Sequence, residues 1–562
     1  MKSRSILVRF PGYPFSFEAL MPDHELASTA ACLLAEGHET VIRDFGTVGL
    51  VDRLFPETVR GAVSEIADRF LDFSPVSPLR ALHLLWQLRA ADRAFQTRQV
   101  SCCEELAEKL AETEKVDFIA LKIDVADDLH SAILLAKRIR QHNAKVCLLA
   151  FGQAAGLYGW QLVSSTGAFD GVCVGDPEVG ITALADNIRH RDRWPSLPNL
   201  IFPGTDRPCH TEQEFAPDLD ALPEPVYDPD VYRALRNNRK LKLFPIEESR
   251  GCDNTCSDCP KSTQDGGLRL RSPGRVMSHI QRIVASHGVG AFRIVGAGGS
   301  MAHAASVAND ILECGSKVAY SRAGNLASAN PALLKVLKAS GCVSLSYRVG
   351  SGSQRLLRDY FGQNAGVSGI ESLLRSCKDA GLIALARFTY PTPADDHHTR
   401  AETLRLLERA RPDAGLVELP EVLPRTLWYQ QPWRYGFGLT FGNRLDHILR
   451  TRSRFGTPPG RWRSLPYRIG ELTATQAIQH HESMLREVES LGIVAHMLEE
   501  TPLVARVLGW YSSLADFRTQ AIRQFLTGDI HGIARMVKDF NVRAATGAVL
   551  GQSAHLRAAV GN

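Results

Sequence analysis

The segment EESRGCDNTCSDCPKS (247–262) follows an apolar run, LKLFPIEES (241–249), and spaces three cysteines as C-x3-C-x2-C. Gly, Asp, Asn and Ser around them favour a loop, so the sulfurs of Cys252, Cys256 and Cys259 can converge. Three thiolates without a fourth nearby can hold three irons of a 4Fe-4S cluster and leave one iron open. Zinc normally takes four closed ligands, which are missing here. We therefore predict a cluster, with zinc or inert thiols as alternatives.

Further apolar runs follow this one, separated by helical patterns. They are AFRIVG (291–296), KVAYSR (317–322), CVSLSYRV (342–349), LIALARFTY (382–390) and AGLVELPEV (414–422). Six strand-helix units in succession predict a barrel, or part of one, whose site lies at the C-terminal ends of the strands. The cysteine loop would lie at that end.

The N-terminal half shows a similar alternation. Its apolar runs are SILVRF (5–10), ETVIRDF (39–45), DFIALKI (117–123), KVCLLAF (145–151) and GVCVGD (171–176). Continuous apolar strands separated by helices are typical of a parallel sheet covered on both faces. The fold class is therefore α/β, with a Rossmann-like doubly wound domain ahead of the barrel.

Composition shifts mark the domain boundaries. The proline-rich stretch 216–232 predicts a linker, because proline breaks both helices and central strands. An insertion over about 50–113 ends in an amphipathic helical pattern, and after residue 440 only helical patterns remain. We predict a Rossmann-like domain over 1–205, a linker over 206–240, a (β/α)6 barrel over 241–440 and a helical region over 441–562.

Charge is nearly balanced in the 562 residues, with 65 Lys and Arg against 61 Asp and Glu. Because these charges are interspersed, general nucleic-acid affinity is not expected. The N-terminal apolar run is interrupted at Arg9, too early for a signal peptide, and no run of about 18 apolar residues could span a bilayer. We expect a cytoplasmic protein without membrane association, and a monomer.

Together these features resemble the radical S-adenosylmethionine (SAM) superfamily, and within it the subgroup with an N-terminal cobalamin-binding domain. The cysteine motif is the specific signal, and several other segments occur in the order seen in that subgroup. They are LRLRSPGRVMSHI (268–280), SRAGN (321–325), RVGSGSQRLL (348–357), LPRTLWYQQPWRYGFG (423–438), VCVGDPEVG (172–180) and DLDALPEPVYD (218–228). The resemblance spans roughly residues 1–440.

The resemblance implies a division of labour between cofactors and protein. Cys252, Cys256 and Cys259 would ligate the 4Fe-4S cluster, whose open iron would bind the amino and carboxylate groups of SAM. An electron from a flavodoxin- or ferredoxin-like donor would cleave SAM to methionine and a 5'-deoxyadenosyl radical, which would abstract hydrogen from a small-molecule acceptor. Methylcobalamin would supply the methyl group, and a second SAM would restore it. The protein would position the reactants and exclude water.

Two positions depart from the pattern of the subgroup. Asp258 precedes the third cysteine where an aromatic residue is usual, and Gly350 replaces the usual acidic residue before SGSQ. Both positions lie where SAM is commonly held, so the expected consequence is a variant mode of SAM binding. Methyl transfer from cobalamin by a polar route, without radical cleavage, is an alternative.

The predicted SAM contacts follow the second, third and fourth barrel strands. Gly298, Gly299 and Ser300 occupy the place of a glycine-rich contact to the amino group of SAM, where glycine allows close backbone approach. Arg322 ends the third strand and could pair with the carboxylate of SAM, a surface salt bridge being the alternative. Ser351 completes the set. No catalytic residue is assigned.

The predicted cobalamin contacts follow the strands of the Rossmann-like sheet, because ligands of such sheets lie beyond the strand C-termini. They are Tyr13, Asp124, Val125, Gly152, Gln153, Ala154, Gly175, Asp176 and Glu178. The D-x-H-x-x-G motif that supplies a histidine to cobalt in many cobalamin enzymes is absent, since Ala126 stands where the histidine would be. The alternative is a Rossmann domain that no longer binds a cofactor.

The predicted function is cobalamin-dependent radical SAM methylation of an unactivated carbon, or a phosphinate phosphorus, of a small metabolite. Antibiotic or other specialised-metabolite biosynthesis is the expected setting. One alternative is rearrangement or cyclisation without net methyl transfer, and another is a non-catalytic iron-sulfur or cobalamin-binding protein. Trp462, Tyr467 and Trp510 are candidates for the acceptor pocket, with packing in a helical core as the alternative.

Overall fold

The computed structural model describes residues 2–545, and its gaps are 56, 58, 59, 62, 66, 68–76, 113–115, 125–126, 238, 297–298, 327–329, 440–466 and 511–512. The chain forms two compact units. The described residues of the first lie within 2–241 and Ile522–Arg535. Those of the second lie within Lys242–Leu439, 467–521 and 536–545.

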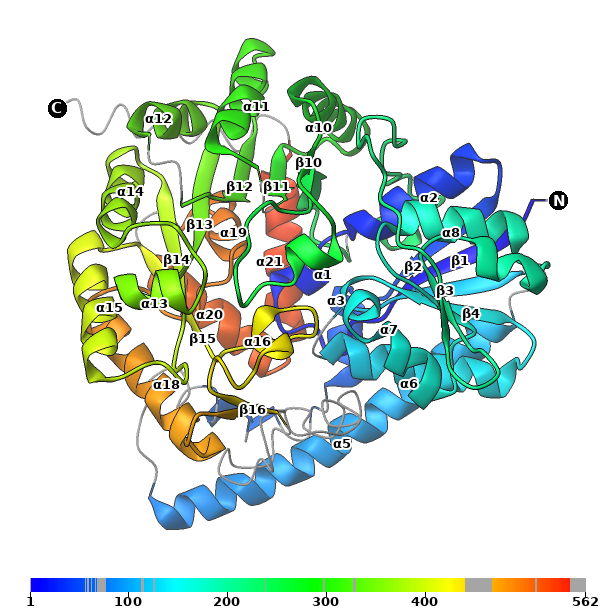
Figure 1. Cartoon of the computed structure of the whole chain (residues 1–562), viewed down its shortest axis with the longest axis horizontal. Coiled ribbons are helices and arrows are strands. Elements are labelled where there is room, and N and C mark those ends of the chain that lie inside the picture. Colours follow the sequence, from blue (N-terminus) through cyan, green and yellow to red (C-terminus); the bar gives the residue numbers. More distant parts are fainter. Residues whose placement is uncertain are drawn as a thin grey trace. The chain divides into compact units, whose positions relative to one another are not determined.

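The first unit is built on a seven-stranded sheet in the order β2-β1-β3-β4-β5-β6-β7 (Figure 1). Its first five strands are parallel and coincide with the five predicted apolar runs. They are β1 (Arg4–Arg9), β2 (Glu39–Asp44), β3 (Phe118–Lys122), β4 (Cys147–Phe151) and β5 (Gly171–Cys173). The chain runs outward from β1 to β2 and returns to β3, so the switch point lies between β1 and β3.

Helices cover both faces of this sheet. α2 (His24–Ala35) packs against α8 (Pro177–Asn187), whereas α5 (Pro78–Ala111) packs against α6 (Asp127–His142). Right-handed crossovers that run along the sheet in opposite directions, as β1 to β2 and β3 to β4 do, place their helices on opposite faces. The unit also contains α1 (Phe17–Leu20), α3 (Val48–Leu54), α7 (Gln153–Thr166) and two 3-10 helices, η2 (Arg191–Ser196) and η3 (Arg233–Leu235). The predicted Rossmann-like architecture is thus confirmed.

Two short strands extend the sheet beyond the prediction. β6 (Leu200–Phe202) pairs antiparallel with β5, and β7 (Cys209–His210) pairs antiparallel with β6. Runs of three and two residues are too short to show a strand period in the sequence. Between β7 and residue 232 the chain has no helix or regular strand, as the proline-rich composition predicts.

The second unit is built on a six-stranded parallel sheet in the order β15-β14-β13-β12-β11-β8 (Figure 1). The strands are β8 (Phe244–Glu247), β11 (Ala291–Val295), β12 (Ala319–Ala323), β13 (Cys342–Gly350), β14 (Ile383–Thr389) and β15 (Ala414–Glu418). Each strand lies beside the one before it, which is the order of a (β/α)6 array. In the described part of the chain β8 and β15 do not pair with each other, so the barrel is open.

Helices separate the strands of this sheet and follow its last strand. Between strands lie α9 (Lys261–Gln264), α10 (Pro273–His287), α11 (Met301–Glu313), α12 (Pro331–Ala339), α13 (Gln354–Asp359), α14 (Val367–Asp379) and α15 (His397–Ala410). After β15 come α16 (Leu427–Gln430), the pair β16 (Phe437–Leu439) and β17 (Tyr467–Ile469), α18 (Ala474–Ser490), α19 (Thr501–Val507), α20 (Leu514–Leu526) and α21 (Ile530–Arg543). The described part of the C-terminal region is therefore mainly helical, as predicted.

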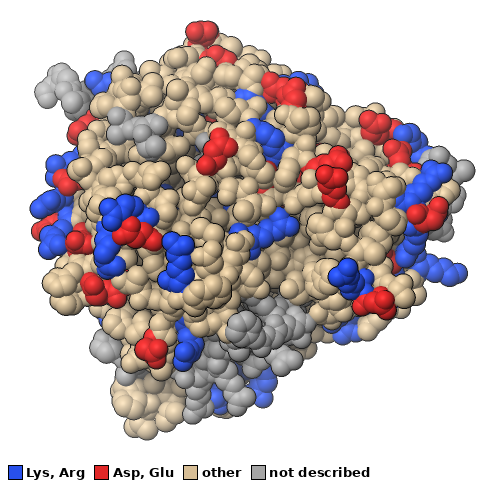
Figure 2. Space-filling model, viewed as in Figure 1, with Lys and Arg blue, Asp and Glu red and all other residues tan. Residues whose placement is uncertain are grey.

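None of the described helices is both long enough and apolar enough to cross a membrane. On the face drawn in Figure 2, basic and acidic side chains lie interspersed, as they do along the sequence.

Candidate functional site

The three cysteines lie in a loop between two short strands that follow β8. These strands, β9 (Ser249–Arg250) and β10 (Arg269–Leu270), pair antiparallel and close the base of the loop. Because β8 ends at Glu247, the loop begins at the C-terminal end of the first barrel strand. This is the end of a parallel barrel that carries functional sites.

Backbone geometry at the base of the loop requires glycine. Gly251 has φ +70°, and a Cβ at this position would lie only 2.2 Å from the carbonyl oxygen of Gly267. The next residue, Cys252, donates its N–H to the Gly266 oxygen at 3.3 Å. Across the loop, the Leu268 N–H donates to Asp253 Oδ1 at 2.9 Å. A side chain at Gly251 would therefore displace the first cysteine.

Ser257 anchors the middle of the loop to two distant segments. Its N–H donates to the Phe361 oxygen at 2.9 Å, and its own carbonyl accepts from the Trp428 N–H at 3.1 Å. The Tyr435 hydroxyl lies 3.2 Å from Ser257 Oγ. Phe361, Trp428 and Tyr435 belong to one buried hydrophobic cluster. The second and third cysteines are therefore held by packing as well as by hydrogen bonds.

The three thiols are free and partly buried. The Asn254 N–H lies 3.4 Å from Cys252 Sγ. Burial raises the pKa of Cys256 to about 12 and also raises the pKa of Cys259, so a nearby cation would be needed to favour the thiolates. In the described chain no three His, Cys, Asp or Glu side chains surround one metal ion. A donor set of three thiols fits an iron-sulfur cluster, in which each thiolate takes its own iron.

A buried ion pair lies at the ends of β8 and β12. Arg322 Nη2 is 2.6 Å from Glu248 Oε1, and the two side chains are 3% and 1% exposed. The other oxygen, Glu248 Oε2, and the other nitrogen, Arg322 Nη1, are buried and have no hydrogen-bond partner in the described part of the chain. Leaving such atoms unpaired is costly, which makes them candidates for a bound ligand.

The structure brings two of the predicted SAM contacts together through Glu248. A Cβ added to Gly299 would lie 3.5 Å from Glu248 Oε1, and Arg322 holds the same oxygen. Ser300 caps α11, where its Oγ accepts from the His303 N–H at 3.1 Å. Gly298 lies outside the described residues. Glu248 itself was missed, because its sequence neighbours assign it only to a strand end.

Ser351 lies elsewhere, at the turn after β13. It is buried, its Oγ lies 3.4 Å from Thr403 Oγ1, and it accepts from the Ser353 N–H at 3.2 Å. These contacts give the Ser351 hydroxyl its partners within the protein.

The two departures from the subgroup pattern are linked through Arg348, which pairs with Asp258 and lies two residues before Gly350. Asp258 Oδ2 is 2.6 Å from Arg348 Nη2, and Asp258 Oδ1 is buried without a partner in the described residues. Two residues after Arg348, Gly350 has φ +81° at an irregularity in the pairing of β13 with β14. An acidic side chain at Gly350 would be strained, because the backbone there is in the left-handed region.

A second charged group, which the sequence analysis missed, connects three barrel strands to the segment before α19. Glu499 accepts from Arg387 at 2.7 Å, from Arg293 at 2.5 Å and from Ser346 at 3.1 Å. Burial alone would raise the pKa of Glu499, but the two arginines lower it below its usual value. Local sequence patterns could not predict this group, because Arg293 and Glu499 are 206 residues apart in the sequence.

The candidate aromatic residues of the C-terminal region lie in packed clusters. Tyr467 is buried against Phe437, with ring centroids 5.8 Å apart, and its hydroxyl donates to the Pro420 oxygen. Trp510 packs against Phe517 at 5.7 Å. Trp462 lies outside the described residues.

At the carboxyl edge of the first unit's sheet, Lys122 is the centre of a cluster of carboxylates. Its Nζ lies 2.7 Å from Asp23 and from Asp124, and 3.7 Å from Glu25. Burial would raise the pKa of Asp23, but Lys122 and Arg9 lower it to about 2. Asp124 therefore lies at the predicted edge, although its carboxylate is already paired.

The other predicted cobalamin residues start the helices that follow β4 and β5. Gly152 has φ +95°, and its Cβ would lie 2.9 Å from the Ile123 oxygen, which also accepts from the Ala154 N–H. Gln153 begins α7, and Gly175 has φ +85°. Asp176 accepts from the Ala216 N–H at 2.8 Å, and Glu178 accepts from Ser28 Oγ at 2.5 Å. Val125 lies outside the described residues.

Tyr13 lies within an aromatic cluster of the first unit. Its ring lies 4.6 Å from Phe15 and 5.9 Å from Phe55, and its hydroxyl donates to the Phe525 oxygen at 2.7 Å. Burial raises its pKa well above the usual value. These contacts satisfy Tyr13 within the protein.

Comparison with solved structures shows which class of proteins shares this fold. The chain is similar over most of its length to cobalamin-dependent radical SAM enzymes, which confirms the resemblance seen in the sequence and the predicted fold class. No protein-family model matches the chain. No curated protein matches its sequence either.

Two individual proteins represent this class. The radical SAM methyltransferase TsrM from Kitasatospora setae, with cobalamin and a [4Fe-4S] cluster bound, has a TM-score of 0.63 at 12% identity, covering 95% of this chain and 100% of that one. A TsrM structure with tryptophan substrate and a SAM analogue has a TM-score of 0.59 at 14% identity, and the match covers 87% of this chain and 89% of that one. The cobalamin-dependent SAM radical enzyme OxsB, with aqua-cobalamin bound, has a TM-score of 0.53 at 12% identity, and the match covers 82% of this chain and 57% of that one. At such identities the likeness establishes the fold.

Proposed function

We propose that this protein is a cobalamin-dependent radical SAM methyltransferase acting on a small metabolite. The observation that carries the proposal is the three-cysteine loop at the end of the first barrel strand, together with the buried Glu248–Arg322 pair at the ends of β8 and β12, which has one unpaired atom on each side. The fold shared with TsrM and OxsB, whose structures hold cobalamin, supports the assignment.

The Glu248–Arg322 pair is complementary to the amino-acid end of SAM. Glu248 Oε2 can accept from an ammonium group, and Arg322 Nη1 can donate to a carboxylate. The two groups are fixed by their own 2.6 Å contact, so little side-chain entropy is lost on binding. Gly299 leaves the side of Glu248 open.

The cofactors would supply reactivity that protein side chains lack: when bound, a 4Fe-4S cluster provides an electron and cobalamin provides a methyl-carrying cobalt. Cys252, Cys256 and Cys259 would hold three irons. The residues at the carboxyl edge of the first unit's sheet, including Asp124 and Gly152, would bind cobalamin. The Ser257 anchors would keep the cysteine loop in place.

The partners proposed are a small-molecule acceptor and a flavodoxin- or ferredoxin-like electron donor. Antibiotic or other specialised-metabolite biosynthesis is the proposed setting. A second candidate, supported by the likeness to OxsB, is radical SAM chemistry with cobalamin but without net methyl transfer.

The first test removes one cysteine from the loop. Anaerobically reconstituted full-length protein should hold about four irons and four sulfides and absorb broadly near 400 nm, and Cys256→Ala should lose the cluster. Cys314→Ala, which changes an exposed cysteine outside the loop, is the matched control and should keep it. A wild-type protein without iron and sulfide would refute the proposal.

The second test separates the two candidate reactions. With methyl-labelled SAM, cobalamin and a strong reductant, methyl transfer should convert SAM into S-adenosylhomocysteine and move label to cobalamin or an acceptor. Rearrangement without methyl transfer should leave the label in methionine. Absence of all SAM-derived products would indicate a binding protein.

A further inference from the structure

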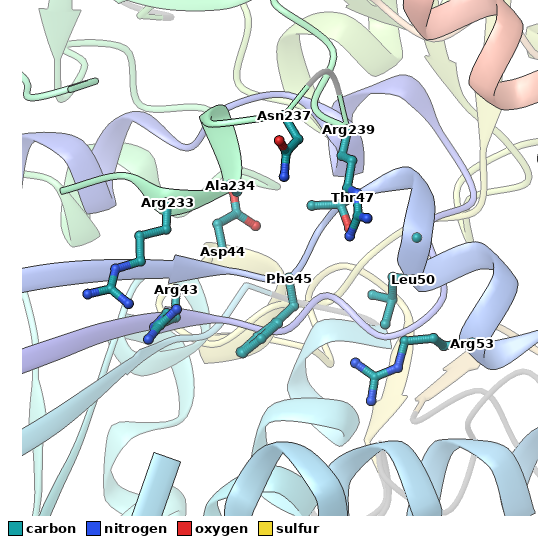
Figure 3. A pocket seen from close by; sticks show the side chains of 11 residues that line it. Arg43, Asp44, Phe45, Thr47, Leu50, Arg53, Arg233, Ala234, Asn237 and Arg239 are labelled. Atoms are coloured by element: carbon teal, nitrogen blue, oxygen red, sulfur yellow. The ribbon is translucent and has the colours of Figure 1, made fainter. Parts of the chain in front are cut away.

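A cavity of about 320 Å³ lies beside the end of β2 in the first unit (Figure 3). Its walls come from the end of β2 and the segment after it, from α3 and from the segment around η3. None of the predicted cobalamin contacts lines it, and neither do the residues of the cysteine loop. The proposed function therefore makes no use of this cavity.

Arginines dominate its polar lining. They are Arg43, Arg53, Arg233 and Arg239. Arg53 is paired with Glu105 at 2.6 Å. The guanidinium groups of Arg43, Arg233 and Arg239 form no hydrogen bond or ion pair with any residue in the described part of the chain. Three positive charges therefore face the cavity without a protein counterion.

The acidic residue in the lining does not balance these charges. Asp44 Oδ2 lies 2.5 Å from Lys240 Nζ and accepts from the Tyr232 hydroxyl at 2.5 Å, while its Oδ1 accepts from the Gly46 N–H at 2.9 Å. Both charged side chains of this pair are almost fully buried. Asp44 is neutralised by Lys240, so the cavity keeps its positive charge.

Two of the free arginines are neighbours by backbone pairing. Ile42 forms a parallel bridge with Tyr232, and its N–H donates to the Val231 oxygen at 2.8 Å, which places Arg43 beside Arg233. Burial lowers the pKa of Arg43, and the charges of Arg233 and Arg236 lower it further. Like charges on paired segments are destabilising. A bound anion would relieve this repulsion.

The cavity also has an apolar wall. In Figure 3 the ring of Phe45 lies between the Arg43–Arg233 side and the side that carries Arg239. Leu50 adds further apolar surface. A ligand that fills the cavity therefore needs an anionic group and an apolar part beside it.

We propose that this cavity is a binding site for a small phosphorylated molecule with a planar apolar portion. Arg43 and Arg233 hold the phosphate, because the planar guanidinium fork matches phosphate oxygens. Arg239 adds charge from the other side, and the planar portion packs on Phe45. The volume suits a ligand of this size. The site is independent of the cysteine loop, so the proposal does not rest on the proposed function.

Isothermal titration calorimetry of the full-length protein with phenyl phosphate tests the site. Inorganic phosphate probes the arginines alone, and phenol probes the apolar wall alone. Phenyl phosphate should bind more tightly than either, and its affinity should fall as salt is raised. Arg43→Gln and Arg233→Gln should each weaken it by about tenfold or more, because each removes charge-assisted hydrogen bonds. Phenyl phosphate that binds no better than phenol would overturn the proposal.

Arg236→Gln is the matched control, since Arg236 is close in sequence but pairs with Asp230 at 2.7 Å and does not line the cavity. It should bind phenyl phosphate nearly as the wild type does, and an equal loss would show a general charge effect and overturn the proposal. Thermal unfolding checks that each variant is folded. Broadening of the ³¹P resonance of phenyl phosphate by the wild-type protein reports binding without the use of any variant.

Cobalamin carries a phosphodiester that could itself occupy the cavity. The titration with phenyl phosphate is therefore repeated on protein that has first been loaded with hydroxocobalamin. Unchanged affinity for phenyl phosphate supports a separate site. Competition between the two would assign the cavity to cobalamin and overturn the proposal.

Discussion

The carboxyl ends of the two parallel sheets use charge in different ways. In the first unit, Lys122 at the end of β3 is paired with Asp23 and Asp124. In the second unit, Glu248 and Arg322 are paired with each other, yet each keeps a buried atom without a partner in the described chain. Charges that satisfy one another stabilise a fold, whereas buried polar atoms left unpaired indicate a place for a ligand.

The largest effect is expected from breaking the satisfied cluster. Lys122→Met leaves the carboxylate of Asp124 without its cation and that of Asp23 with only Arg9, 3.8 Å away, so the first unit should lose about 3–5 kcal/mol of stability. Urea unfolding measures the loss, and hydrogen exchange in β3 localises it. Lys137→Met, an exposed lysine on α6, should change stability by no more than about 0.5 kcal/mol. Equal effects of the two variants would contradict this reading of the cluster.

A substitution in the Glu248–Arg322 pair should affect ligand binding more than the stability of the fold. Glu248→Gln keeps an oxygen for Arg322 but removes the charge that we propose binds the ammonium group of SAM, so SAM affinity should fall by about 10- to 100-fold, or 1.5–3 kcal/mol. Equilibrium dialysis of the reconstituted protein with labelled SAM measures this.

The neighbouring residue supplies the control for this prediction. Both oxygens of Glu247 are occupied, by Arg250 at 2.6 Å and by Arg271 at 3.0 Å. Glu247→Gln should therefore leave SAM affinity close to that of the wild type. If Glu248→Gln binds SAM as the wild type does, the pair is structural only.

The sequence alone could predict the strands but not these pairings. β4 is buried along its whole length, and such a continuous apolar run is visible in the sequence. Glu248 and Arg322 are 74 residues apart, and Asp23 and Lys122 are 99 residues apart. Their contacts depend on which strands lie side by side, which local patterns do not specify.

The cysteine loop could be found because its chemistry is local. Three ligands within eight positions, next to a strand, need no knowledge of the rest of the fold. The arginine cavity is the opposite case, because Arg43 and Arg233 meet only through the bridge between Ile42 and Tyr232. Arginines spread along the chain are indistinguishable in sequence from solvated surface charges.

The last expected effect concerns pH and, for a change of a single pH unit, is the smallest; it tests the charge balance of the carboxylates around Lys122. Burial raises the pKa of Glu25 to about 8; Lys122 opposes this shift, while nearby carboxylates, Asp124 first among them, add to it. Between about pH 4.5 and 8 the folded protein therefore holds a proton that the unfolded chain has released. Stability should fall as pH rises through this window, by at most about 1.4 kcal/mol per pH unit.

Urea midpoints at pH 5, 6.5 and 8 test this, since Glu25→Gln cannot release that proton and should flatten the dependence. Glu36→Gln, exposed at the end of the same helix, should retain it. Asp23 works in the opposite sense: its pKa is lowered to about 2, so its contribution is lost only as pH falls below about 4. If Glu25→Gln and the wild type share one pH profile, Glu25 is ionised in the folded protein and Lys122 neutralises all three carboxylates around it.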